Sequence, residues 1–221
     1  MLDRAVKNPY GVGMARPRQF DEDAVLTAVC DQFWDAGYAA TSLQDLMQVS
    51  GLGKGSLYAA FGDKHALFLQ ALRRYTESLD RGLRASFDEA PSALEALRSF
   101  VMSPVGDPEG AAARRGCLLA NSTTELASSD SDVAAEARRA YEATTALLAE
   151  CVERARSEGD LPDAADPVAT ARALLAAQQG LTFMGRSEMD VGTLRTTART
   201  LADELLPAPP VATAAAGTRA S

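Results

Sequence analysis

The apolar positions recur every three or four residues through most of the chain, which is the period of an amphipathic α-helix. The clearest run lies between residues 64 and 83, where Phe68, Leu72 and Tyr75 fall on one side of a predicted long helix. Clusters of β-branched residues are scarce, whereas alanine, leucine, glutamate and arginine are common after residue 65. The pattern therefore predicts an all-α fold of about nine helices.

Residues 42–61 contain two short helical patterns separated by a tight turn. Ser42 is a predicted N-cap, and Asp45 three residues later makes a weak form of the capping box. Gly51 stops the first helix, because glycine readily adopts the positive φ that a helix end requires. These signals predict a helix-turn-helix.

The outer face of the second short helix has the chemistry of a nucleic-acid contact. Lys54 offers a positive charge to a phosphate or a base edge, and Tyr58 offers a hydroxyl. Gly55 and Ser56 leave little bulk near the helix start, so the backbone can approach a phosphate closely. No acidic residue occurs from residue 51 through 62. An ordinary helical hairpin does not require this exposed pattern, so we predict a DNA-reading helix.

The motif resembles a known family. Thr41-Ser42-Leu43, the run from Gly53 to Tyr58, Phe61 and Lys64 resemble the helix-turn-helix signature of TetR-type transcriptional regulators. The resemblance covers about residues 19–79. It implies an N-terminal DNA-binding domain over 19–79 and a C-terminal ligand-binding and dimerisation domain over 80–206. The residues expected to bind DNA are Arg16, Arg18, Thr41, Ser42, Lys54, Gly55, Ser56, Leu57, Tyr58, Phe61 and Lys64.

The resemblance further implies a homodimer on a palindromic double-stranded DNA operator, released by an unknown small-molecule effector. Repression is the expected action. A much weaker likeness to one TetR subgroup lies in the segment Gly116–Asn121.

The two ends of the chain have no helical period. Residues 1–18 form a predicted flexible basic arm, whose Arg16 and Arg18 either reach DNA or remain a solvated tail. Met14 resembles the usual start of the family's chains, so either Met1 or Met14 is the natural start. Residues 207–221 are rich in alanine and proline and form a predicted disordered tail.

The 221 residues carry a net charge of −8, which argues against a non-specific coat on nucleic acid. The chain has three cysteines with no short spacing between them, so neither a disulfide framework nor a zinc site is expected. No apolar run approaches the ~20 residues that a membrane span needs. We therefore expect a cytoplasmic protein without membrane contact, metal or cofactor.

Enzyme motifs are not evident. The sequence contains no P-loop, no nucleophile elbow and only one histidine, His65, so we predict that the protein is not an enzyme. The alternative is a thiol-based redox or electrophile sensor, or a thiol enzyme, that uses Cys117. This cysteine follows Arg114 and Arg115 at a predicted helix start, where a thiolate is favoured, but the same pattern describes a small buried residue.

Polar residues on otherwise apolar C-terminal helices mark candidate ligand contacts, because a buried polar group costs free energy unless it is paired. A satisfied core contact or a solvated position explains each of them equally well. The candidates are Cys117, Asn121, Glu125, Tyr141, Thr144, Gln178, Gln179 and Phe183.

The last two predicted helices carry small and leucine-rich faces that suit a four-helix dimer interface, although a bundle closed within one chain would use the same pattern. The candidate interface residues are Leu174, Leu181, Leu194, Ala198, Leu201 and Leu205.

Overall fold

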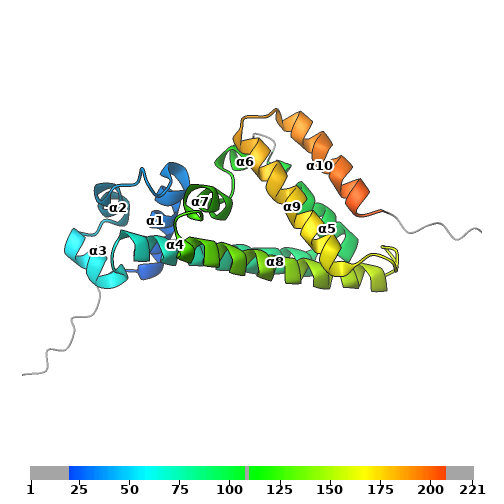
Figure 1. The fold of residues 1–221 in the computed structure, drawn as a ribbon, viewed down its shortest axis with the longest axis horizontal. Helices are drawn as coiled ribbons and strands as arrows, with labels where there is room; N and C mark the ends of the chain where they lie inside the picture. The colour runs from blue at the N-terminus through cyan, green and yellow to red at the C-terminus, as the bar shows by residue number, and fades with distance from the viewer. Residues whose placement is uncertain (1–19, 108–109, 208–221) are drawn as a thin grey trace, which may run out of the picture.

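The computed structural model describes residues 20–107 and 110–207 (Figure 1). These residues form helices and no β-strand, which confirms the all-α prediction. The proposed DNA contacts Arg16 and Arg18, with the rest of the arm, lie outside the described residues, as does the tail beyond Pro207. None of the described helices is both long and apolar enough to cross a bilayer.

Ten α-helices and one short 3₁₀ helix follow one another along the described part of the chain. They are α1 (Glu22–Ala36), α2 (Leu43–Ser50), α3 (Lys54–Phe61), α4 (Lys64–Glu89), α5 (Ala93–Met102), η1 (Ser103–Val105), α6 (Ala111–Arg115), α7 (Leu118–Leu126), α8 (Ser131–Ser157), α9 (Pro167–Arg186) and α10 (Val191–Leu205).

The first three helices gather at one end of the molecule around an aromatic core (Figure 1). The rings of Phe33 and Phe68 meet edge to face with centroids 5.0 Å apart, and the Tyr38 ring lies 4.9 Å from Phe68. This spacing is the favoured range for aromatic pairs. The core therefore fixes α1 on the first turns of α4.

The long helix α4 leaves this end and runs beside α8 into the other half of the molecule (Figure 1). Asp63 caps its start by accepting a hydrogen bond from the Ala66 N–H at 2.8 Å. Its 26 residues form one uninterrupted helix, longer than the predicted run to residue 83. The DNA-binding and C-terminal regions thus share one continuous element.

Helices α5, α8, α9 and α10 enclose a second core, which is mainly leucine, alanine and valine with Phe87 and Phe100. Leu174, Leu181, Leu194 and Ala198, which we predicted at a dimer interface, are at most 1% exposed within their own subunit. Leu201 and Leu205 are half-buried against the same core. The prediction was wrong for the first four, because the apolar stripe closes the bundle of one chain.

Two short elements, the 3₁₀ helix η1 and the five-residue α6, connect α5 to α7. Helix α7 starts only at Leu118, because Gly116 has φ +73° and cannot continue a right-handed helix. The chain therefore turns sharply between α6 and α7.

Candidate DNA-binding interface and effector region

Local sequence rules build the pair α2 and α3. The Ser42 Oγ accepts from the Asp45 N–H at 3.2 Å, and the Asp45 carboxylate accepts from the Ser42 N–H at 2.7 Å, so both bonds of the capping box form. The Ser42 hydroxyl also donates to the Asp45 carboxylate at 2.7 Å, and this bond, together with the one from the Ser42 N–H, lowers the pKa of Asp45. Gly51 adopts the left-handed conformation, φ 67°, that ends α2. The predicted turn is therefore present.

Helix α3 presents Lys54, Gly55 and Ser56 to solvent, whereas Tyr58 is half-buried. The Lys54 Nζ lies 5.8 Å from the centroid of the Tyr58 ring, so the two candidate contacts share one face of the helix. A cation and a hydroxyl on one exposed face can bind neighbouring phosphates or a phosphate and a base edge.

Three of the predicted DNA-binding side chains face the interior. Leu57 and Phe61 are 0% and 3% exposed and anchor α3 on the aromatic core. Thr41 is 1% exposed, and its hydroxyl donates to the Gly37 carbonyl at 2.7 Å. Their side chains hold the reading helix in place and do not reach a DNA surface, which corrects the expectation of direct contact.

Lys64 lies at the start of α4, beside the helix-turn-helix. Its Nζ is 4.4 Å from the centroid of the Tyr38 ring, and both side chains are half-buried. The ring holds the ammonium near the exposed edge of the domain, where a phosphate can pair with it.

Sequence reasoning missed Gln44 and Gln48 as candidate contacts. Both are exposed on α2, on the side opposite the buried Leu46. Glutamine amides can read an adenine edge or bind phosphate. Their four-residue spacing, away from the apolar positions of the same helix, was the signal that could have revealed them.

Comparison with known proteins identifies the family. Residues 25–71 match the model described as bacterial regulatory proteins, tetR family, and residues 93–201 match the tetracyclin repressor-like C-terminal domain. The uncharacterized HTH-type transcriptional regulator YezE of Bacillus subtilis is 31% identical over 82% of this chain and 94% of its own. The chain belongs to the TetR family. It is therefore a DNA-binding transcriptional regulator, as the motif predicted.

Two further TetR relatives are informative. The HTH-type transcriptional repressor ComR of Escherichia coli is 32% identical over 77% of this chain and 82% of its own. A solved structure of a cysteine mutant of the TetR family regulator CifR holds a 26-bp double-strand operator DNA. It is 29% identical to this chain, superposes with a TM-score of 0.72, and the match covers 85% of this chain and 98% of CifR.

The predicted ligand-binding residues do not converge on one cavity. Glu125 accepts hydrogen bonds from the DNA-binding region, and Phe183 is 66% exposed. The Thr144 hydroxyl donates to the Ala140 carbonyl at 3.0 Å within α8. These contacts are local or structural.

The remaining candidates form two separate groups. Asn121 donates to the Arg115 carbonyl at 3.3 Å near Cys117. On α9, Gln179 donates to Gln178 at 3.0 Å, and Gln178 donates weakly to Ser103 at 3.4 Å. Tyr141 belongs with the first group, where burial is the main cause that raises its pKa and the Cys117 thiol adds to it.

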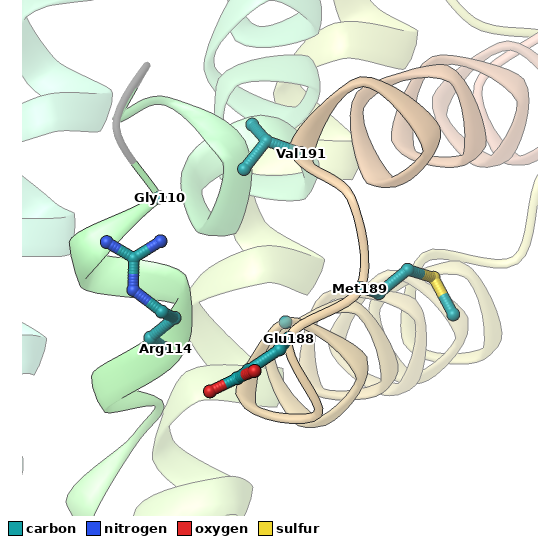
Figure 2. Close-up of a pocket in the computed structure, with 6 residues that line it drawn as sticks. Gly110, Arg114, Glu188, Met189 and Val191 are labelled. Atoms are coloured by element: carbon teal, nitrogen blue, oxygen red, sulfur yellow. The ribbon is translucent and has the colours of Figure 1, made fainter.

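A cavity of about 320 Å³ lies instead between α6 and the turn that joins α9 to α10. Figure 2 shows Arg114 on α6 with its guanidinium beside Gly110, across the cavity from Glu188 and from Val191, the first residue of α10. The cavity is also lined by Gly110, Gly185 and Met189. Glu188 has φ 59°, a left-handed conformation that a side chain of this kind seldom adopts, so the turn is strained at the cavity edge.

A second cavity, of about 290 Å³, lies between α4 and α8. Phe87, Leu147 and Cys151 supply its apolar lining. Burial raises the pKa of the Cys151 thiol, which disfavours a thiolate there. This cavity, like the first, contains none of the predicted ligand contacts.

Cys117 is buried at the start of α7, where the Tyr75 hydroxyl donates to its sulfur at 3.5 Å. Burial, reinforced by this thiol, raises the pKa of Tyr75. Arg114 lines the first cavity and Arg115 pairs with α1, so the two arginines that suggested a redox role are directed elsewhere. The geometry favours a packing role for Cys117.

Proposed function

We propose that this protein is a ligand-responsive repressor that binds a palindromic operator as a homodimer. The observation that carries the proposal is the exposed, acid-free face of α3 with Lys54 and Ser56, mounted on a capped α2. The repressor name of ComR and the operator complex of CifR support it. Buried Leu57 holds this face rigidly, which suits base reading.

A symmetric pair of reading helices accounts for the palindrome. In helix-turn-helix dimers the two helices enter successive major grooves about 34–36 Å apart. One α3 offers few groups that can form hydrogen bonds with bases. Two copies therefore bind DNA more tightly than one and recognise a longer DNA sequence.

The exposed side of α9 is the best dimer surface. Val168, Ala176, Gly180 and Phe183 fall on one face of this helix and are all exposed, with Val168 at 43% and Phe183 at 66%. Small residues let two helices approach closely, and an exposed phenylalanine gains from burial. This surface replaces the buried leucines of the sequence-based prediction.

The cavity beside α6 is the effector site in this proposal. Its volume of about 320 Å³ suits a small molecule, and it combines Arg114 and Glu188 with apolar Val191. The effector would have to bind the DNA-free arrangement more tightly than the DNA-bound one, because only a difference in affinity shifts the equilibrium.

Selection of bound sequences from random double-stranded DNA tests the proposal directly. We expect an enriched inverted repeat, protected as one unit in a footprint, and lower expression of a reporter placed behind it. No enrichment, or binding to a single half-site by one subunit, would reject the dimeric repressor.

A further inference from the structure

Helix α7 makes a second connection between the two halves of the molecule. It packs against α1 as well as against α4 and α8. A charged side chain lies at each end, Arg115 just before the helix and Glu125 in its last turn. Both side chains contact the DNA-binding region.

Glu125 holds the turn that leads into the helix-turn-helix. Its Oε2 accepts from the Tyr38 N–H at 3.0 Å, and its Oε1 accepts from the Ala39 N–H at 2.7 Å. Gly37 makes room for the carboxylate, since a Cβ at that position would lie 3.0 Å from Oε2. A charged acceptor on two successive amides is the contact of a helix cap, made here between regions far apart in the sequence.

Arg115 holds the last turns of α1. Its Nε donates to Asp35 at 2.8 Å, and its Nη2 donates to Asp31 at 2.7 Å. The guanidinium carbon lies 4.0 Å from the centroid of the Trp34 ring. Two carboxylates and one aromatic face fix the planar group in position and direction.

We propose that Arg115 and Glu125 are positioning residues for DNA binding, which orient the helix-turn-helix through α1 and the α1–α2 turn, in addition to the connection through α4. Arg114, the neighbour of Arg115, lines the cavity beside α6. An effector that displaces α6 would therefore also disturb the contacts of Arg115 with α1. This inference rests on the proposed function and adds a route by which the effector would control DNA binding.

The first experiment is the substitution Glu125→Gln, which keeps the size of the side chain and turns an N–H donor toward an amide N–H. Since Glu125 is exposed, the loss resembles that of a helix cap, about a fivefold weaker operator affinity. The salt dependence of binding should not change, because the residue meets no phosphate. Glu142→Gln, at an exposed position on α8, is the matched control and should bind normally. Wild-type affinity in Glu125→Gln would overturn the proposal.

A second measurement needs no DNA. Hydrogen exchange at the Tyr38 and Ala39 amides should quicken in Glu125→Gln and remain unchanged in Glu142→Gln. Trp34 is the only tryptophan, so its emission should shift in Arg115→Lys, which keeps the charge but loses the planar stacking. Unchanged exchange would show that Glu125 does not hold the α1–α2 turn, and this would overturn the inference even if an operator is found. Faster exchange in a protein for which no operator is found would instead reject the proposed repressor function, while the contact of Glu125 with the α1–α2 turn would be confirmed.

A double-mutant cycle tests the link to the cavity. Val191→Phe should press on α6, because a Cβ on Gly110 would already lie 2.7 Å from the Val191 side chain. We expect it to weaken operator binding several-fold, about as much as the loss of one cap, and to have little further effect in Arg115→Ala. Circular dichroism shows whether each variant is folded. Additive effects in folded variants would reject the cavity route.

Discussion

The DNA-binding region and the C-terminal region are both helical, yet they are built from different chemistry. The first packs rings against rings, with Phe33, Tyr38 and Phe68 in mutual contact. The second packs mainly leucine, alanine and valine side chains, together with the rings of Phe87 and Phe100. Aromatic pairs have preferred angles as well as distances, whereas small aliphatic side chains accept several arrangements.

Their candidate sites differ in the same direction. The DNA-binding groups lie on consecutive helices, so neighbours in sequence are neighbours in space. The cavity brings Gly110 close to Val191, and the hydrogen bond between α7 and the α1–α2 turn joins Glu125 to Ala39. Both pairs are far apart in the sequence. The proposed DNA-binding groups are thus close together in the sequence, whereas the candidate sites of the C-terminal region are assembled from segments that are far apart in the sequence.

The largest expected effect is on the aromatic core. Phe33→Ala should cost about 3–5 kcal/mol of unfolding free energy and abolish operator binding, because it removes a ring that is 1% exposed. Leu79→Ala, at a position 47% exposed, should change stability by less than about 0.5 kcal/mol. Urea unfolding measures both. A loss below about 1 kcal/mol in Phe33→Ala would show that the aromatic contacts do not hold the DNA-binding region together.

The next effect concerns the outer surface of the C-terminal region. Phe183→Glu should convert the proposed homodimer to monomers in sedimentation, because it places an unpaired charge in the proposed apolar contact, a cost of about 3–5 kcal/mol. Leu79→Glu introduces the same change at an exposed leucine on α4 and should leave the dimer intact. A normal dimer in Phe183→Glu would place the interface away from α9.

The reading helix should respond in a smaller and more specific way. Lys54→Ala should weaken operator binding by about 1–3 kcal/mol and reduce the salt slope by about one. Arg81→Ala removes the same charge from an exposed position farther along α4, and its binding and slope should match wild type. Titrations at several salt concentrations distinguish them. Equal behaviour of the two variants would mean that α3 does not read the DNA.

Acid should loosen the contact between α4 and α8. Burial by itself raises the pKa of Glu136, but hydrogen bonds from Arg139 and Thr76 and the charges of Arg139 and Arg73 outweigh it, so the pKa lies below its ordinary value of 4.5. A lowered folded-state pKa adds stability above pH 4.5 that is lost as pH falls through the lowered value.

Glu136→Gln tests this contribution. Relative to wild type, the variant should lose about 1–3 kcal/mol at neutral pH, and its stability should fall less steeply below pH 4.5. Urea unfolding across this range measures the difference. Parallel pH curves for the two proteins would show that another carboxylate is responsible.

The smallest effect is expected at the thiols. Burial, aided by the charge of Asp31, raises the pKa of Cys30 to about 11, and Cys117 and Cys151 are buried. A thiol reagent at neutral pH should therefore react slowly with the folded protein and quickly after unfolding. Rapid modification that is lost in Cys117→Ser would restore the sensor alternative.

Local rules explain which features the sequence could predict. Ser42, Asp45 and Gly51 act within one turn of the chain, so their caps followed from residue type and spacing. The apolar stripe with Leu174 and Leu194 correctly predicted burial, but periodicity does not state whether the same chain or a second one covers it.

Long-range partners were beyond sequence reasoning. Glu125 looked like a ligand contact because it interrupts an apolar helix, yet its partners are amides of the α1–α2 turn. Arg115 appeared to serve a neighbouring thiol, and the sharp turn at Gly116 separates it from α7 and leaves it paired with α1. A single sequence contains no signal for either pairing.

The length of α4 has a mechanical consequence. At 1.5 Å per residue its 26 residues span about 39 Å. A tilt of about five degrees at one end therefore moves the other end by about 3.4 Å, which equals the rise of one base pair. A tilt of this size would therefore move each reading helix by a distance comparable to one base step. The recognition helices would then be offset from the operator half-sites by about one base pair.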